Sequence, residues 1–272
     1  MKPKRLPSPP HNPGVRDLVK EKRRWSRPLP LDARKRGFPG WHESGYLPHR
    51  DEPGLIQFVT FRLADAFPAE LRSEWKALFV IEDDRKRRTE LEAYLDRGHG
   101  GCHLRQIHIG QMVEDALRFF PNDRYELRAW VVMPNHVHVL FLVQAEPMWR
   151  VLDSWKSYTA KEANKRLGRT GKFWQDGYWD TYMRDAAHEA KTVRYIENNP
   201  ANAQLVHDPR DWPLSSARFR NEYGALLLPP IAQSNAIVAP AASDETRRAE
   251  LIRRSTPGPE CARPGRSNLL PA

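Results

Sequence analysis

Apolar and polar residues alternate along residues 55–63, and this pattern predicts a β-strand. Successive side chains of a strand point to opposite faces, and the stretch is rich in β-branched and aromatic residues. One face would carry Ile56, Phe58 and Thr60, and the other Leu55, Gln57, Val59, Phe61 and Leu63. Two further apolar runs, at 124–133 and 136–143, predict strands that are joined at Pro134 and Asn135.

Helical spacing of apolar residues recurs in four other segments. The predicted helices span residues 68–98, 104–120, 148–167 and 186–199. The last helix is expected to end before Pro200, because a proline disfavours helical geometry in the residue that precedes it. The aromatic segment 171–185 is predicted to be a loop with short strand pieces, and residues 208–219 a short ordered appendage.

The resulting order, β–α–α–β–β–α–loop–α, indicates an α+β sandwich in which helices cover one face of an antiparallel sheet. The chain is expected to have three parts. They are a basic, Pro-rich and irregular arm over residues 1–45, a folded domain over 46–223, and a disordered Pro-, Ala- and Arg-rich tail over 224–272.

The charge of the chain is spread unevenly, and this distribution bears on the kind of partner that the protein binds. The chain of 272 residues has a formal net charge of +10. Residues 1–50 hold 13 Lys/Arg and 4 Asp/Glu, a balance of +9, which leaves +1 for the remainder. A basic arm on a nearly neutral body favours a polyanionic partner, with nucleic acid the first candidate. A solvated leader that aids solubility explains the same charge.

Composition also bears on where the protein works. No run of about 18 apolar residues occurs, so neither a membrane span nor a membrane partner is predicted. The N-terminus lacks the apolar centre of a secretory signal. The two cysteines, Cys102 and Cys261, lie far apart without metal-type spacing, which indicates a reducing, cytoplasmic setting.

Two histidines interrupt the third predicted strand. His136 and His138 are two residues apart, so they project from the same face of the sheet. Two imidazoles at this spacing can bind one metal ion if a third ligand joins them. A pair of structural histidines would produce the same pattern, so the spacing alone leaves both readings open.

A second spacing supplies the missing groups. Tyr195 and Asn199 are four residues apart, so they share one face of the last predicted helix. An amide oxygen suits a hard divalent ion such as Mg²⁺ or Mn²⁺, and a phenol can act as a nucleophile beside a cation. If this helix packs over the face that carries His136 and His138, three ligands and a nucleophile converge. The competing tyrosines, none of which has Asn or Gln four residues later, are Tyr158, Tyr178 and Tyr182.

Several motifs, taken in order, make the chain resemble a known family. They are "VTFRLAD", "VVMPNHVHVLF", "SWKSYTAKEANKRLGRTGKFWQ", "VRYIENNPANAQLV" and "DWPLSSA". Over about Tyr46 to Phe219 the chain resembles the REP-associated tyrosine transposases, a domesticated branch of the single-tyrosine HUH transposases of insertion-sequence type. The segment "HVH" matches the family's His-hydrophobic-His signature. Tyr195 stands where the family keeps its nucleophile, and Asn199 where a Gln or Asn completes the metal site.

The resemblance implies a ferredoxin-like α+β domain and an enzyme that cuts single-stranded DNA at or beside a hairpin. Mg²⁺ or Mn²⁺ would be held by His136, His138 and Asn199, while Tyr195 would form a 5′-phosphotyrosine link that a 3′-OH can resolve. Repeated palindromic elements are the expected substrates. The enzyme would act as a homodimer, as related insertion-sequence enzymes do, or as a monomer.

Cations beside aromatic residues predict where the DNA is contacted. Residues 150–172 carry a local balance of +5, with aromatic residues nearby. A solvated helix face with core aromatics explains this pattern too. The predicted DNA-binding residues are Lys156, Lys161, Lys165, Arg166, Arg169, Lys172 and Trp174.

Two rival functions stay open. One is a catalytically silent regulator of the same fold that binds hairpin DNA. The other is a metallohydrolase that uses the His136–His138 metal to activate water. It would normally need a carboxylate near the histidines, and none is adjacent in the sequence.

Overall fold

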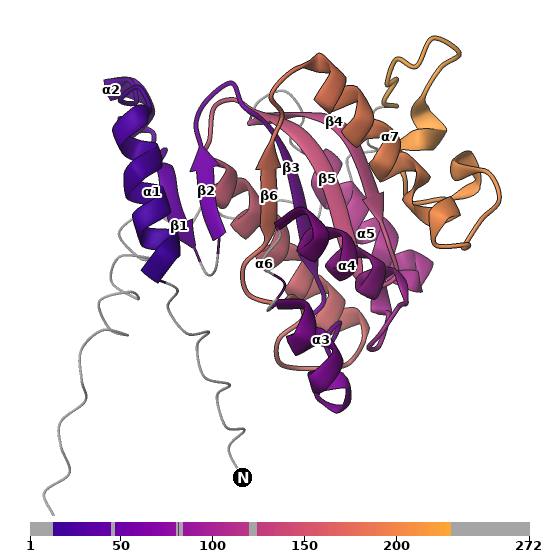
Figure 1. Cartoon of the computed structure of the whole chain (residues 1–272). Coiled ribbons are helices and arrows are strands. Elements are labelled where there is room, and N and C mark those ends of the chain that lie inside the picture. The colour runs from indigo at the N-terminus through magenta and orange to yellow at the C-terminus, as the bar shows by residue number, and fades with distance from the viewer. Residues whose placement is uncertain (1–12, 45–46, 80, 82–83, 120–123, 230–272) are drawn as a thin grey trace, which may run out of the picture. The chain divides into compact units, whose positions relative to one another are not determined.

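A four-stranded antiparallel sheet forms the centre of the fold in the computed structural model, which describes residues 13–44, 47–79, 81, 84–119 and 124–229 (Figure 1). Its strands, in the order in which they pair, are β4 (Tyr125–Val132), β5 (His136–Val143), β3 (Ile56–Arg62) and β6 (Trp179–Tyr182). The three predicted strands are confirmed, and β6 is a strand piece of the kind expected within 171–185. The strand with the two histidines lies between two neighbours.

Helices connect these strands. They are α3 (Arg72–Phe79), α4 (Asp84–Asp96) and α5 (Ile107–Arg118) between β3 and β4, α6 (Met148–Arg166) between β5 and β6, and α7 (Ala186–Asn202) after β6. Short 3₁₀ helices span Ala69–Leu71, His103–Arg105, Pro209–Asp211 and Ser216–Phe219. None of the described helices combines the length and the apolar character that crossing a membrane requires.

The prediction of a single helix over residues 68–98 is wrong, because the structure has two helices there with a break between them. α3 ends at Phe79 and α4 begins at Asp84, while residues 80, 82 and 83 lie outside the described residues. The sequence at the break is "VIEDD". The β-branched pair lowers helix propensity, and aspartate is favoured where a helix begins. Apolar spacing did not reveal this break, because it continues on both sides.

The predicted end of the last helix before Pro200 is also wrong, since α7 continues through this proline to Asn202. Pro200 is buried in the final turn. A proline there loses the N–H bond to the carbonyl four residues earlier and crowds that carbonyl, and tertiary packing outweighs this cost. As a result Asn199 stays on the helix, one turn after Tyr195.

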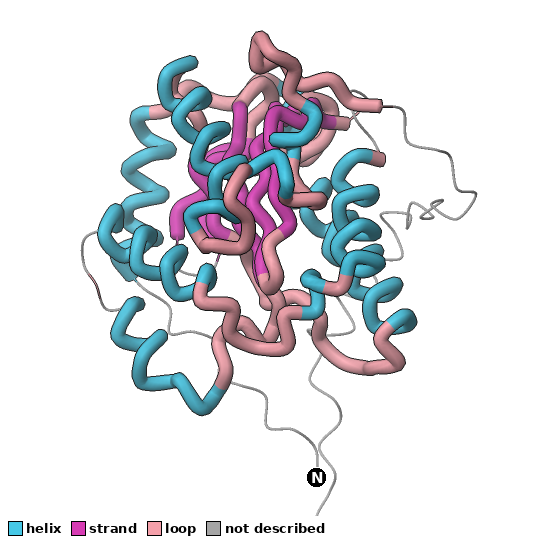
Figure 2. Tube along the Cα trace, turned by 90° about the vertical axis from the view of Figure 1, so that its right-hand side faces the viewer, coloured by secondary structure: helices cyan, strands magenta, loops and turns pink. Residues whose placement is uncertain are grey.

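Helices cover both faces of the sheet, which corrects the prediction of helices on one face only. α5 and α6 pack against the face that carries Phe61 and Val139. α7 packs on the other face, where Ile196 joins one cluster with Phe58 and Leu140. Figure 2 shows the strands in the middle, with helices on either side. Apolar residues such as Phe58 and Leu140 share the second face with polar ones, so this face also needs a helix to cover it.

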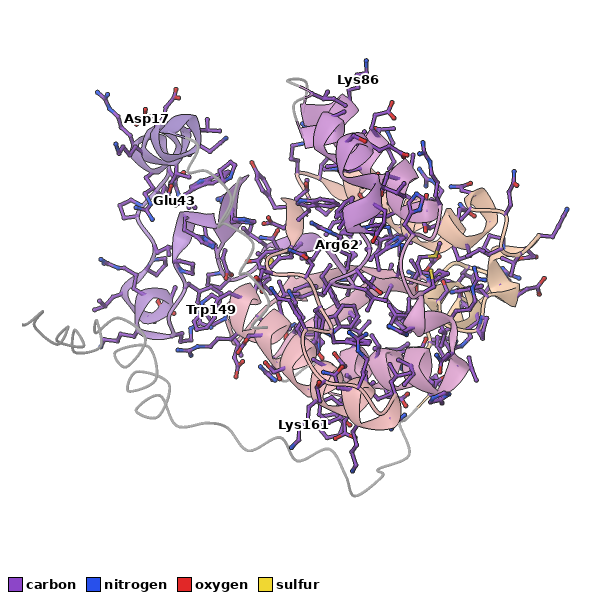
Figure 3. All side chains as sticks on the ribbon, turned by 90° about the horizontal axis from the view of Figure 1, so that it is seen from below. Asp17, Glu43, Arg62, Lys86, Trp149 and Lys161 are labelled. Carbon is purple, nitrogen blue, oxygen red and sulfur yellow. The ribbon has the colours of Figure 1, made fainter. Side chains whose placement is uncertain are left out.

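The N-terminal segment is ordered where it is described, so the prediction of an irregular arm is wrong for residues 13–44. It forms α1 (Pro13–Trp25), α2 (Leu31–Lys35) and β1 (Gly40–Ser44), which pairs with β2 (Leu47–Asp51). Figure 3 labels Asp17 of α1 and Glu43 of β1 among these elements. Val19 and Trp41 pack together, and the Lys22 ammonium lies 4.6 Å from the Trp41 ring centre. A short amphipathic helix therefore docks on a hairpin, and the predicted boundary at residue 45 falls between its strands.

The start of the predicted tail is ordered too. Leu226 and Leu228 pack on the core, and Arg118 donates to the Pro229 carbonyl at 2.8 Å. The prediction of disorder is therefore wrong for residues 224–229, and the rest of the tail, 230–272, lies outside the described residues.

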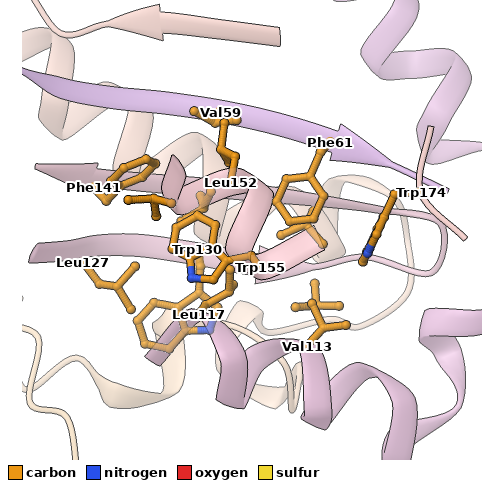
Figure 4. Close-up of a cluster of buried hydrophobic side chains, with 14 of the residues drawn as sticks. Val59, Phe61, Val113, Leu117, Leu127, Trp130, Phe141, Leu152, Trp155 and Trp174 are labelled. Carbon is orange, nitrogen blue, oxygen red and sulfur yellow. The ribbon is translucent and has the colours of Figure 1, made fainter. Parts of the chain in front are cut away.

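The main core lies between the sheet and the α5–α6 pair (Figure 4). Its large aromatic residues keep their polar atoms paired. Trp130 donates from Nε1 to Glu114 at 2.8 Å, and Trp155 donates to the Tyr125 hydroxyl at 3.0 Å. Buried indoles without such partners would cost stability, so these bonds help to fix β4, which pairs with the strand that carries the two histidines.

Candidate active site

The two histidines of β5 lie side by side and are buried, with exposed fractions of 1% for His136 and 0% for His138. Their Nε2 atoms are 3.1 Å apart, and their ring centres are separated by 4.6 Å at an interplanar angle of 75°. Both face the side of the sheet that α7 covers. The strand geometry predicted from the sequence is confirmed.

The outer nitrogen of each ring has its own partner. His136 Nδ1 lies 2.8 Å from the Asn135 side-chain oxygen, and His138 Nδ1 lies 2.8 Å from the Thr60 hydroxyl. Thr60 is directly opposite His138 in the β3–β5 register. Such contacts hold a ring in place and direct the other nitrogen at a common point, as outer-shell partners do around metal ions.

Helix α7 brings the other predicted residues to this point. The Tyr195 ring lies 5.5 Å from the His138 ring and 5.9 Å from the Phe58 ring, centre to centre. Asn199 is buried, and its side-chain oxygen has no hydrogen-bond partner among the described residues. A buried orphan acceptor is costly, which is explained if it binds a cation.

Asp96, at the end of α4, also lies at this candidate site, although no pattern in the sequence indicated it. Its carboxylate lies 3.7 Å from His136 Nε2 and accepts a hydrogen bond from the Asn199 side chain. No spacing in the sequence reveals this contact, because forty residues separate Asp96 from the histidines and the charged end of its helix looks solvated. Asp96 links the strand to α7.

Burial sets the electrostatics of the site. It lowers the pKa of His136 to about 3, and the positive charge of Arg62 adds to this effect. Burial also raises the pKa of Asp96 to about 7, as does the charge of Glu92, whereas the hydrogen bond from Asn199 lowers it. At neutral pH the His136 ring is therefore uncharged, which is the form that binds a metal ion.

The donor set fits a divalent cation. Two nitrogens bonded to one ion at about 2.1 Å lie roughly 3 Å apart when their bonds make a right angle, and the two Nε2 atoms match this separation. Within the part of the chain that the structure describes, no three His, Cys, Asp or Glu side chains form a metal-binding group. A cation here would therefore need the Asn199 oxygen as its third protein ligand.

The predicted DNA-binding cations do not gather around this site. α6 packs on the opposite face of the sheet from His136 and His138. Lys161 and Lys165 are exposed there, and Arg166 donates to the His108 carbonyl at 2.7 Å.

Lys156 in the middle of α6, and Arg169 and Lys172 after it, are bonded to nearby groups of the protein. Lys156 donates to the carbonyls of Gln175 and Gly177 at 2.8 and 2.9 Å, and burial lowers its pKa to about 8. Arg169 donates to the Lys172 carbonyl at 3.2 Å, and Lys172 forms an ion pair with Asp176. For all six cations DNA binding stays a prediction.

Trp174 does not fit the predicted role of stacking on a base. Its side chain is 5% exposed, packs against Phe61 with ring centres 4.9 Å apart, and donates to the Thr159 hydroxyl at 2.8 Å. An indole in the core has no open face for a nucleobase, so the structure argues against this prediction.

Comparison with known proteins gives these groups a context. Residues 108–199 match the family model described as "Transposase IS200 like", and His136, His138, Tyr195 and Asn199 all lie within them. The REP-associated tyrosine transposase of Escherichia coli (strain K12) is 29% identical over 112 residues, which cover 39% of this chain and 63% of the relative. The predicted resemblance is confirmed. This chain is similar to the REP-associated tyrosine transposases, and it spans less than two thirds of the length of the curated relative.

Solved structures show more distant likeness. A REP-associated tyrosine transposase bound to a REP hairpin is 19% identical, with a TM-score of 0.43 over 70% of this chain and 94% of the other. A transposase-like protein from Deinococcus radiodurans R1 is 14% identical, with a TM-score of 0.25 over 58% and 96%.

Proposed function

We propose that this protein cuts and rejoins single-stranded DNA, with Tyr195 as the nucleophile. The observation that carries the proposal is the meeting of four groups that the sequence keeps about sixty residues apart. The Nε2 atoms of His136 and His138 lie 3.1 Å apart, and Tyr195 packs on His138. One helix turn later, Asn199 has a buried, unpartnered oxygen and donates to Asp96, the carboxylate next to His136. The match of IS200-like transposases to residues 108–199 supports the same chemistry.

The reaction follows from a phenol placed beside a phosphodiester. The Tyr195 oxygen forms a bond to the phosphorus, and the bond from phosphorus to the 3′-oxygen breaks. The phenol proton is lost as the bond forms, and the departing oxygen takes up a proton to become a 3′-OH. The 5′-phosphotyrosine link keeps the bond energy, so a 3′-OH can later attack the link and release Tyr195 without a nucleotide cofactor.

His136, His138 and Asn199 would hold the Mg²⁺ or Mn²⁺ that we infer for this site. Bound there, such an ion would offset the negative charge that develops on the phosphate oxygens. The chain's own groups do the rest. Thr60 and Asn135 orient the two rings, and Phe58 positions the Tyr195 ring against His138.

The proposed substrates are repeated palindromic elements that form hairpins with single-stranded flanks. Two things support this choice. The curated relative is REP-associated by name. In addition, the net charge of +10 favours a polyanion as partner.

The test is the formation of a covalent adduct. The protein is incubated with Mn²⁺ and single-stranded DNA that carries hairpins from the region flanking its gene, and an SDS-resistant adduct is sought. We expect an adduct with the native protein and none with Tyr195→Phe. The matched control is Tyr158→Phe, because Tyr158 is also a half-buried helix tyrosine but lies on α6.

Two outcomes would contradict the proposal. One is an adduct that survives the Tyr195→Phe change. The other is the absence of an adduct with every hairpin substrate, which would favour the DNA-binding regulator if the DNA still binds.

One observation supports a second candidate. The metallohydrolase needs a carboxylate near the histidines, and Asp96 is 3.7 Å from His136. In that case DNA hydrolysis would persist in Tyr195→Phe without an adduct, and Asp96→Asn would abolish it. The two variants therefore separate the candidates in one assay.

We also infer that the domain is ferredoxin-like. Between β3 and β6 the elements follow the order strand, helices, strand, strand, helix, strand, and the first and third of these strands pair at the centre. This arrangement is that of a split β–α–β sandwich.

A further inference from the structure

Arg62 is the one charged residue of the "VTFRLAD" motif that stands on the same face of the sheet as the two histidines. It is neither a proposed metal ligand nor the proposed nucleophile. It is the last residue of β3 and lies directly opposite His136 in the β3–β5 register. Residues directly opposite each other in an antiparallel pair point to the same face and are close neighbours. The arginine therefore projects from the same face as the histidines, beside them.

Among the described residues, the guanidinium of Arg62 has no counter-ion. No carboxylate in the described part of the chain forms an ion pair with it, and its Nε atom is buried without a hydrogen-bond partner. Burial alone lowers the pKa of Arg62 to about 9, so it is still a cation at neutral pH. Buried charges in proteins are normally paired, and an unpaired donor needs an explanation.

Two aromatic rings hold this cation in place. The guanidinium carbon lies 4.4 Å from the Phe67 ring centre and 4.5 Å from the Trp179 ring centre. Figure 3 shows Arg62 near the middle of the molecule and Lys161 of α6 at its rim. Aromatic rings attract a guanidinium through its faces and leave the N–H edge available.

We propose that Arg62 binds the DNA phosphate that Tyr195 attacks, an assignment that rests on the proposed function. The planar N–H edge would donate to the non-bridging oxygens of this phosphate, while Phe67 and Trp179 keep the side chain from turning away. The protein would thereby place the phosphate against the histidine pair before any bond changes. Charge supplied from a fixed, half-buried position is worth more than charge from exposed lysines such as Lys161 and Lys165 on α6.

The experiment measures DNA binding without cleavage. Tyr195→Phe protein is titrated in EDTA with a fluorescent hairpin that has single-stranded flanks, at several salt concentrations. Adding Arg62→Gln should weaken binding about tenfold and reduce the slope of log K against log salt by about 0.7, the value for one phosphate contact on a single strand. Arg210→Gln, which removes an exposed cation after α7, is the matched control and should change neither quantity by as much.

The phosphate is located with neutral methylphosphonates, placed one at a time along the flank. At the contacted position, the loss caused by the methylphosphonate and the loss caused by Arg62→Gln should not add, because both remove the same contact. At every other position they should add. The non-additive position should also be the one joined to Tyr195 in the adduct assay.

The outcomes test the role of Arg62 and the role of Tyr195 separately. Additive losses at every position, or an unchanged salt slope, would overturn the role of Arg62 whatever the adduct assay shows. Non-additivity at one position without any adduct would keep the phosphate contact and remove the nucleophile. If Arg62→Gln does not fold, Arg62→Lys replaces it. This variant should keep the salt slope and lose affinity, because it retains the charge without the fork of donors.

Discussion

At the residue scale, the site depends on side chains that hold other side chains. Thr60 is an example, because its hydroxyl lies 2.8 Å from His138 Nδ1 and neither group reaches solvent. The ring nitrogen that faces His136 can point there only while the other nitrogen is held. A residue that is neither a proposed metal ligand nor the proposed nucleophile is thus expected to control how the site is arranged.

Replacing Thr60 by valine tests this control. Thr60→Val keeps the shape of the side chain and removes the hydroxyl, so His138 can rotate. We expect the affinity for Mn²⁺, measured on the protein alone by electron paramagnetic resonance titration, to fall by about tenfold.

Thr192→Val is the matched control for this change. Thr192 is also buried and bonded through its hydroxyl, but it donates to the His188 carbonyl on α7. An equal loss of Mn²⁺ affinity in both variants would mean that Thr60 acts only through general stability.

At the scale of elements, close packing places α5 beneath the sheet. Gly110 is buried near the start of this helix, where a Cβ atom would meet the Leu214 side chain and come within 2.6 Å of the Leu104 carbonyl oxygen. At this point α5 is therefore in close contact with Leu214, in the segment after α7. Helix propensity and packing make opposite demands at this glycine.

Gly110→Ala measures which demand is stronger. Alanine favours a helix over glycine by about 1 kcal/mol, whereas overpacking against backbone costs about 1–3 kcal/mol. Because a carbonyl oxygen cannot move aside as a side chain can, we expect a net destabilisation of about 1 kcal/mol or more in urea unfolding. The control is Ser157→Ala on the exposed side of α6, which should be neutral or slightly stabilising. A stabilised Gly110→Ala protein would show that the helix shifts freely.

At the scale of the whole described structure, one carboxylate connects the N-terminal hairpin to helix α6. Asp51 of β2 is 0% exposed and accepts hydrogen bonds from the first amides of α6, at 3.0 Å from Met148 and 3.3 Å from Trp149. Pro147 at the start of α6 offers no side-chain cap, so Asp51 supplies one from another element. Burial raises the pKa of Asp51 to about 6, although both amide bonds lower it.

This shift predicts how stability depends on pH. Between its ordinary pKa of 3.8 and about 6, Asp51 holds its proton in the folded state and loses it in the unfolded state, so stability falls as pH rises. Relative to Asp51→Asn, the native protein should lose at most about 3 kcal/mol between pH 4 and pH 6.5. Urea unfolding at a series of pH values measures this difference. Asp32→Asn is the control, because its side chain is 73% exposed and should follow the native curve.

Part of the site could be read from the sequence because it depends on short-range geometry. The two-residue spacing of His136 and His138 and the four-residue spacing of Tyr195 and Asn199 determine which side chains share a face. The three apolar strands follow from the same kind of regularity. Local periodicity failed where tertiary packing outweighed it, at Pro200 and in the N-terminal segment.

The sequence by itself therefore determined the three apolar strands of the central sheet, the motif residues and the family that the chain resembles. Only the tertiary structure decided what surrounds them. It brings Asp96 and Arg62 to the histidines, buries Trp174 in the core and sets α6 on the opposite face of the sheet. The physical reason is that these contacts join residues far apart in the chain. Burial and charge pairing at such contacts depend on how whole elements pack, which no local spacing records.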